Sequence, residues 1–96
     1  MSINYDAGHV PPIELHHRLR IAREYAGLEQ EELAAVIGVA RNTIGSAESG
    51  KREPRRITIN AWALVCGVPR QWLIDGTVPS GGAPTAQSVD WYGAAA

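Results

Sequence analysis

The side chains best suited to chemistry lie together in one nine-residue stretch, residues 41–49. At 100° per residue, Ala40, Ile44 and Ala47 fall on one side of a helix, and we expect that side to be buried. The opposite side is formed by Arg41, Asn42, Gly45, Ser46 and Ser49. It offers the guanidinium of Arg41, the amide of Asn42 and the hydroxyls of the two serines. Arg pairs with guanine, Asn with adenine and Ser with either base. For a lone helix, an ordinary solvated face is the commoner explanation of such residues.

A second short helix must hold this stretch in place. The pattern predicts it over residues 30–37, with Leu33, Ala34 and Ile37 on its apolar face. Gly38 and Gly50 follow the two helices, where a residue with positive φ ends a helix. Because helices this short are not stable alone in water, the pair must pack against the rest of the chain. This helix–turn–helix setting favours base contacts by Arg41, Asn42, Gly45 and Ser46 over the solvated face.

The order of residues through both helices follows a known pattern. The matching positions are Gln30, Leu33, Ala34, Gly38, Val39, Ile44, Glu48, Gly50 and Lys51. In this register the stretch resembles the helix-turn-helix of the XRE family, which includes lambdoid phage repressors and Cro proteins. The resemblance extends from about Leu15 to Gly76. It implies an all-α fold: a compact five-helix, lambda-repressor-like DNA-binding domain whose helix at about 41–49 enters the major groove of an operator.

The resemblance also implies roles for individual residues. Arg23 and Glu48 match positions that form a partly buried salt bridge in the family, so we assign Arg23 to structure and not to DNA. Gln30 matches a glutamine that bonds a phosphate and braces the recognition helix. Gly45 stands where the family often has a longer polar residue, and we interpret it as a close approach of the helix backbone to DNA.

A basic run after the second helix is well placed for phosphates. Residues 51–56 carry four cations, one anion and a proline that keeps the run out of a helix interior. Such cations supply the salt-sensitive, sequence-independent part of DNA binding. We expect phosphate contacts from Gln30, Ala40, Thr43, Ser49, Lys51, Arg52, Arg55 and Arg56.

The two motif helices lack their usual caps. Glu29 and Ala40 stand where the family normally has Ser or Thr. Loss of a cap costs about 1 kcal/mol. A glycine inside a helix, as at Gly45, costs about 1 kcal/mol relative to Ala.

The chain divides into three parts. Residues 1–12 are predicted to be an arm, residues 13–76 the helix-turn-helix domain and residues 77–96 a flexible tail. Three further helices are expected at about 13–26, with Pro12 in its first turn, at 57–66 and at 69–74. The tail contains Trp91 and Tyr92, which either form part of a disordered end or dock on the domain or a dimer mate.

Composition excludes several classes of protein. A net charge of −1 and a pI near 6.3 argue against a non-specific DNA coat but not against a specific reader. One cysteine, Cys66, allows no internal disulfide and fits a reducing bacterial cytoplasm; we expect a packed thiol. The sequence has no membrane-spanning run, catalytic arrangement or metal-ligand spacing. We therefore expect no enzyme, cofactor, metal or small-molecule ligand.

The resemblance implies a homodimer on near-palindromic double-stranded DNA. Two alternatives stay open. One is an antitoxin that binds a toxin and represses its own operon. The other is a degenerate helix-turn-helix that binds only protein. This alternative is favoured by the near-neutral charge and by Ala40 and Gly45.

Overall fold

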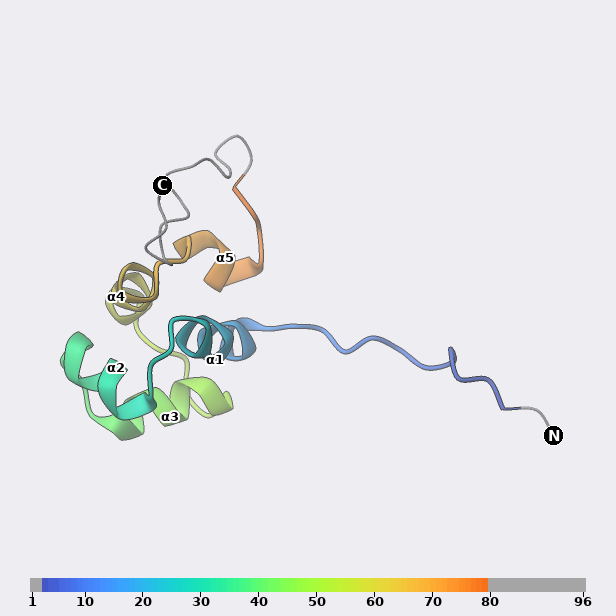
Figure 1. Cartoon of the computed structure of the whole chain (residues 1–96), viewed down its shortest axis with the longest axis horizontal. Helices are drawn as coiled ribbons and strands as arrows, with labels where there is room; N and C mark the ends of the chain where they lie inside the picture. Colours follow the sequence, from blue (N-terminus) through green and yellow to red (C-terminus); the bar gives the residue numbers. More distant parts are fainter. Residues whose placement is uncertain (1–2, 80–96) are drawn as a thin grey trace.

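The structure, a computed structural model, describes residues 3–79, which form five α-helices and no strand within that range (Figure 1). The helices are α1 (Leu15–Tyr25), α2 (Gln30–Ile37), α3 (Arg41–Ser49), α4 (Arg56–Cys66) and α5 (Arg70–Asp75). α1 packs against α3, α4 and α5, and α2 packs against α3 and α4. The all-α, five-helix architecture expected from the sequence is therefore confirmed.

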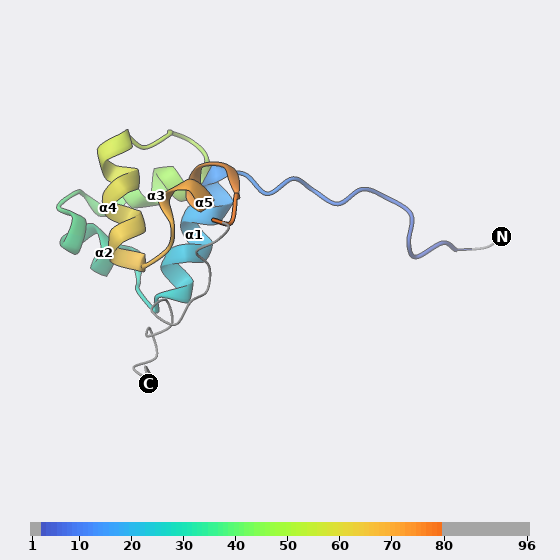
Figure 2. The same ribbon diagram turned by 90° about the horizontal axis from the view of Figure 1, so that it is seen from above.

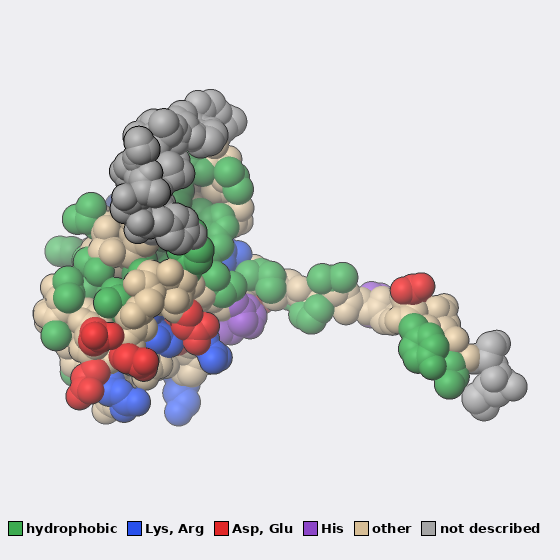
Figure 3. Space-filling model, viewed as in Figure 1, with side chains coloured by type: hydrophobic (Ala, Val, Ile, Leu, Met, Phe, Trp, Pro, Cys, Tyr) green, Lys and Arg blue, Asp and Glu red, His purple; other side chains and the backbone are tan. Residues whose placement is uncertain are grey.

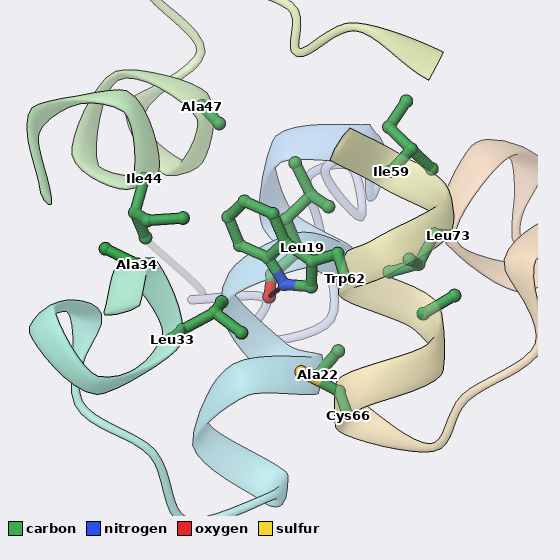
Figure 4. Close-up of a cluster of buried hydrophobic side chains, with 11 residues drawn as sticks. Leu19, Ala22, Leu33, Ala34, Ile44, Ala47, Ile59, Trp62, Cys66 and Leu73 are labelled. Carbon is green, nitrogen blue, oxygen red and sulfur yellow. Dashed lines mark hydrogen bonds between the residues drawn. The ribbon is translucent and has the colours of Figure 1, made fainter. Parts of the chain in front are cut away.

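Trp62 of α4 lies at the centre of the core (Figure 4). Its ring is fully buried, and its indole Nε1–H donates a hydrogen bond to the carbonyl of Leu19 at 3.0 Å. A buried tryptophan needs such an acceptor for its one polar atom. Around it lie Leu19, Ala22, Leu33, Ala34, Ile44, Ala47, Ile59, Ala63, Cys66 and Leu73. α1 through α5 thus share one core.

Cys66 is part of this core, as expected. Burial raises the pKa of its thiol to about 11. The side chain therefore stays a neutral thiol at physiological pH and packs as a small apolar group.

The motif helices have the predicted bounds, whereas α1 does not. The helix expected over 13–26 begins at Leu15, and Pro12 lies before it in non-helical chain instead of in its first turn. Glu14 is the N-cap, and its backbone N–H donates to Nδ1 of His17 at 2.9 Å. This local bond sets the start of the helix two residues later than the proline suggested.

α4 begins one residue earlier than expected and ends where expected, whereas both ends of α5 lie one residue later than expected. Although α4 is rich in apolar residues, Ile57 is 73% exposed and Leu64 83% exposed, while Thr58 is buried. The face carrying Ile59 and Trp62 meets the core, so the helical period turns Ile57 and Leu64 to solvent.

α2 is better capped than its sequence indicated. The Glu29 backbone N–H donates to Oε1 of Glu32 at 2.8 Å, half of a capping box. Glu29 makes no side-chain hydrogen bond as the N-cap, but Glu32 provides a capping bond that was not expected from the sequence. The expected loss of a cap at Ala40 is confirmed, because α3 has no side-chain bond at its N-cap.

Arg18 anchors α5 and the start of the domain from inside α1. It is 7% exposed, and its guanidinium donates to the carbonyls of Leu73, Ile74 and Ile13 at 2.9, 3.0 and 2.6 Å. Residues 3–12 leave the domain beyond this point and extend away from it (Figures 1 and 2). The predicted tail lies mostly in residues 80–96, outside the described part of the chain, and so do Trp91 and Tyr92.

Candidate nucleic-acid interface

The inner side of α3 is fixed to the domain by apolar packing. Ile44 is fully buried and Ala47 nearly so, against α1 and α2 (Figure 4). Gly50 ends the helix with φ +80°, and a Cβ there would lie 3.3 Å from the ring of His16. Only glycine meets both demands, so the turn after α3 packs directly on α1.

A buried ion pair joins α3 to α1. The Arg23 guanidinium donates to Glu48 through Nε to Oε2 at 2.6 Å and through Nη2 to Oε1 at 3.0 Å. Their side chains are only 9% and 4% exposed. The hydrogen bond to Glu48 is the main cause that raises the pKa of Arg23. Arg23 also donates to the Leu28 carbonyl at 2.7 Å, so the turn before α2 is tied to the same group.

Gln30 extends this network to the surface. Its Nε2 donates to Oε1 of Glu48 at 3.1 Å. The amide oxygen Oε1 then lies toward α3, 3.9 Å from where a Cβ on Gly45 would be. Arg23, Glu48 and Gln30 therefore form one chain of bonds from inside α1 to the edge of α3, which we call the brace.

The outer side of α3 is polar. Arg41, Asn42, Thr43 and Ser49 are exposed, and Gly45 and Ser46 are half-buried. Within residues 3–79, the side chains of Arg41, Asn42 and Thr43 make no hydrogen bond or ion pair, and Ser49 donates only to the carbonyl of Ser46. Donors with no partner in the fold, on a helix held from behind, are available to an external ligand.

One hollow lies between this face and the chain that follows it. Asn42 and Ser46 line it from α3, and Lys51, Arg52 and Arg55 line it from the segment before α4. Its volume is about 660 Å³. We call it the basic hollow, since three cations there face one carboxylate, that of Glu53. Figure 3 shows basic side chains at the α3 end of the domain, with acidic side chains beside them.

A smaller hollow lies on the other side of α3. Gly45, Ser49 and Gln30 line it together with Arg20 of α1. Arg20 was not among the sequence-predicted residues. Its spacing of three from Arg23 on the same helix was the available signal, but only the packing of α1 on α3 brings it here. Its Nε lies 3.2 Å from Oε2 of Glu24, an exposed pair that another anion can replace.

The structure separates one predicted residue from the rest. Arg56 lines a different hollow, with Leu15 of α1 and Arg70 of α5. It is the first residue of α4, so the helix turns it away from Arg55. Ala40 and Thr43 lie at the start of α3, both exposed.

No group of side chains suited to a metal is found in residues 3–79. His16 and His17 stack with ring centroids 4.0 Å apart, but His17 is occupied with capping α1. Over the same residues, the helices are too short and too polar to cross a bilayer.

Comparison with known proteins assigns this fold to a family. The helix-turn-helix family HTH_3 matches residues 19–73, and the chain belongs to that family. This confirms the resemblance drawn from residues 30–51.

Two curated relatives are similar in sequence. The HTH-type transcriptional regulator PrtR of Pseudomonas aeruginosa is 39% identical over 79 residues, 82% of this chain and 29% of PrtR. The SPbeta prophage-derived HTH-type transcriptional regulator YonR of Bacillus subtilis is 33% identical over 60 residues, 62% of this chain and 56% of YonR. The chain therefore spans between a quarter and three-fifths of the length of these relatives.

Two solved structures are similar in fold. The restriction-modification controller protein C.AhdI from Aeromonas hydrophila has a TM-score of 0.60 and 31% identity, over 65% of this chain and 94% of that one. The P22 c2 repressor, solved with a synthetic operator, has a TM-score of 0.63 and 22% identity, over 67% of this chain and 97% of the repressor. The fold is thus the lambda-repressor-like one.

Proposed function

We propose that this protein is a sequence-specific DNA-binding transcriptional regulator of the phage-repressor type, and not an enzyme. The observation that carries the proposal is the outer face of α3. It presents polar side chains that have no partner within residues 3–79, beside a basic hollow, while the brace fixes its inner side. The names of the relatives support it, since PrtR and YonR are transcriptional regulators and the c2 repressor was solved on an operator.

Base contacts are assigned to the first two turns of α3. Arg41 and Asn42 are exposed and have two or more donors each, which allows bidentate pairing with guanine and adenine. Ser46 lies one turn after Asn42 on the same side, in the wall of the basic hollow. Gly45 brings no side chain, so DNA can approach the helix backbone there.

Phosphate contacts flank α3 on both sides. Lys51, Arg52 and Arg55 lie on one side, in the basic hollow, and Gln30 and Ser49 on the other. Ala40 and Thr43 offer backbone or hydroxyl donors at the helix start. Arg56 is the weakest assignment, because it lines a separate hollow.

The active form is proposed to be a homodimer on a near-palindromic operator, in the bacterial cytoplasm or nucleoid. Two copies of α3 would occupy major grooves about one helical turn apart. No effector ligand is invoked, since the face of α3 alone supplies the chemistry of recognition.

The test is selection from a random-sequence duplex pool by the full chain, at low and at near-physiological salt. The expected result is an enriched near-palindrome that persists at the higher salt. A single enriched half-site would keep the regulator and remove the dimer. Absence of enrichment, with binding lost as salt rises, would contradict the proposed function. The matched control is Arg70→Ala on α5, an exposed cation outside the basic hollow, which should select the same sequence.

A further inference from the structure

An apolar groove lies between α1 and α5, and DNA binding gives it no role. Its volume is about 320 Å³, and its lining is almost wholly apolar. Ile21 and Tyr25 line it from α1, Val68 from the turn before α5, Trp72 from α5, and Val78 and Pro79 from the chain that follows. The volume is in the range of sites that bind organic groups.

The groove is open to solvent at several large apolar side chains. Ile21 is 46% exposed, Val78 is 72% exposed and Trp72 is half-buried. Contiguous apolar surface of this kind normally marks a binding site. It lies at the α5 end of the domain, and Figure 1 shows α3 at the opposite end.

The course of the chain indicates what covers it. The described residues end at Pro79, in the wall of the groove itself. Seventeen residues follow, 80–96, and their only aromatic residues are Trp91 and Tyr92. Two adjacent aromatics among small and polar residues offer apolar area of the same kind as the lining of the groove.

The length of the tether fits this occupant. Trp91 lies twelve residues after Pro79 in the sequence. A random-coil chain of that length spans about 17–21 Å on average. That is comparable with the shortest extent of the molecule, 21 Å, so the pair can return to the groove from which its tether starts. The tether also holds the pair at an effective concentration of about 1 mM, which favours the chain's own groove over that of a second copy.

We propose that the groove between α1 and α5 binds Trp91 and Tyr92 of the same chain. The segment then closes the apolar surface of the domain on the side away from α3. It leaves the face of α3 free, so the docked segment and DNA are held at the same time.

The test is methyl NMR on the full chain, with isotope-labelled Ile, Leu and Val. The expected result is NOEs from the Trp91 ring to the methyls of Ile21 and Val68. Mixing labelled with unlabelled chains should leave these NOEs unchanged, because they arise within one chain. In Trp91→Ala/Tyr92→Ala the Ile21 and Val68 methyl signals should shift, while the Leu33 and Ile44 signals stay in place. This double variant alters no residue of the helical domain.

A second variant places a charge in the apolar lining of the groove. Ile21→Glu should abolish the Trp91 NOEs, whereas Val36→Glu on α2, at a position 62% exposed, should preserve them. NOEs seen only between chains would overturn docking on the same chain, and absence of any NOE from Trp91 would overturn docking altogether. If Ile21→Glu does not fold, the aromatic double variant decides the question: unshifted Ile21 and Val68 methyls would refute the proposal. DNA binding is predicted to be equal in all folded variants.

Discussion

The two sides of α3 differ in how they are satisfied. On the inner side the buried carboxylate of Glu48 accepts hydrogen bonds from Arg23 and Gln30, and the apolar side chain of Ile44 is fully buried in the core. On the outer side, Arg41 and Asn42 have donors but no acceptor within residues 3–79. The inner side therefore determines the position of α3, and the outer side is left for a ligand. Stability and recognition should therefore be separable by substitution.

The largest expected effect is on the inner side. Glu48→Ala leaves the Arg23 guanidinium buried without its carboxylate and should lower the free energy of unfolding by about 3–5 kcal/mol. Urea denaturation followed by circular dichroism measures it. Glu24→Ala removes the exposed partner of Arg20, which also lies 4.0 Å from Nη2 of Arg23, but it leaves both Arg23–Glu48 bonds in place. As the matched control it should cost less than about 1 kcal/mol. Equal losses in the two variants would show that the brace does not hold α3.

A smaller effect is expected on the outer side. Arg41→Ala should leave stability within about 0.5 kcal/mol, as usual for an exposed residue. It should weaken binding to the selected duplex by about 1–3 kcal/mol. Titration by fluorescence anisotropy on the selected and on a scrambled duplex checks this. A similar loss on both duplexes would remove Arg41 from the base contacts.

The basic hollow should affect affinity without affecting sequence preference. Lys51→Ala should weaken binding to selected and scrambled duplexes alike and reduce the slope of log K against log salt by about 1. The same titration at several salt concentrations measures the slope. Arg56→Ala serves as the comparison, since Arg56 lies outside this hollow, and its slope should change less. A larger change of slope in Arg56→Ala than in Lys51→Ala would assign the phosphate contact to Arg56 instead of Lys51.

The smallest effects are expected at Gly45, where one substitution should raise stability and weaken DNA binding. A Cβ at Gly45 would lie 3.9 Å from Oε1 of Gln30, an ordinary contact, so Gly45→Ala fits the fold. It should stabilise the protein by about 1 kcal/mol through helix propensity and yet weaken operator binding if the DNA backbone approaches there. Thermal denaturation and anisotropy give the two values. Ala40→Ser supplies the missing N-cap of α3 and should also stabilise the protein by about 1 kcal/mol. It should not weaken operator binding. Unweakened binding by Gly45→Ala would refute close approach at Gly45.

The sequence predicted α2 and α3 to the residue, because their signals are local: the helical period, and a glycine with positive φ after the C-terminal end of each helix. It misplaced the start of α1, where the Glu14–His17 bond outweighed the proline. It missed Arg18 and Arg20 altogether. Arg18 is satisfied by carbonyls near residue 74, and Arg20 reaches the edge of α3 only through helix packing. Neither relation leaves a mark in the spacing of residues.

The central claim is that the outer face of α3 reads DNA sequence. The most direct test is to repeat the duplex selection with Arg41→Ala and compare the enriched sequences with those of the unmodified chain. If Arg41 contacts a base, preference is lost at one base pair in each half-site and kept at the others. An unchanged enriched sequence in Arg41→Ala, or no enriched sequence from the unmodified chain, would contradict it.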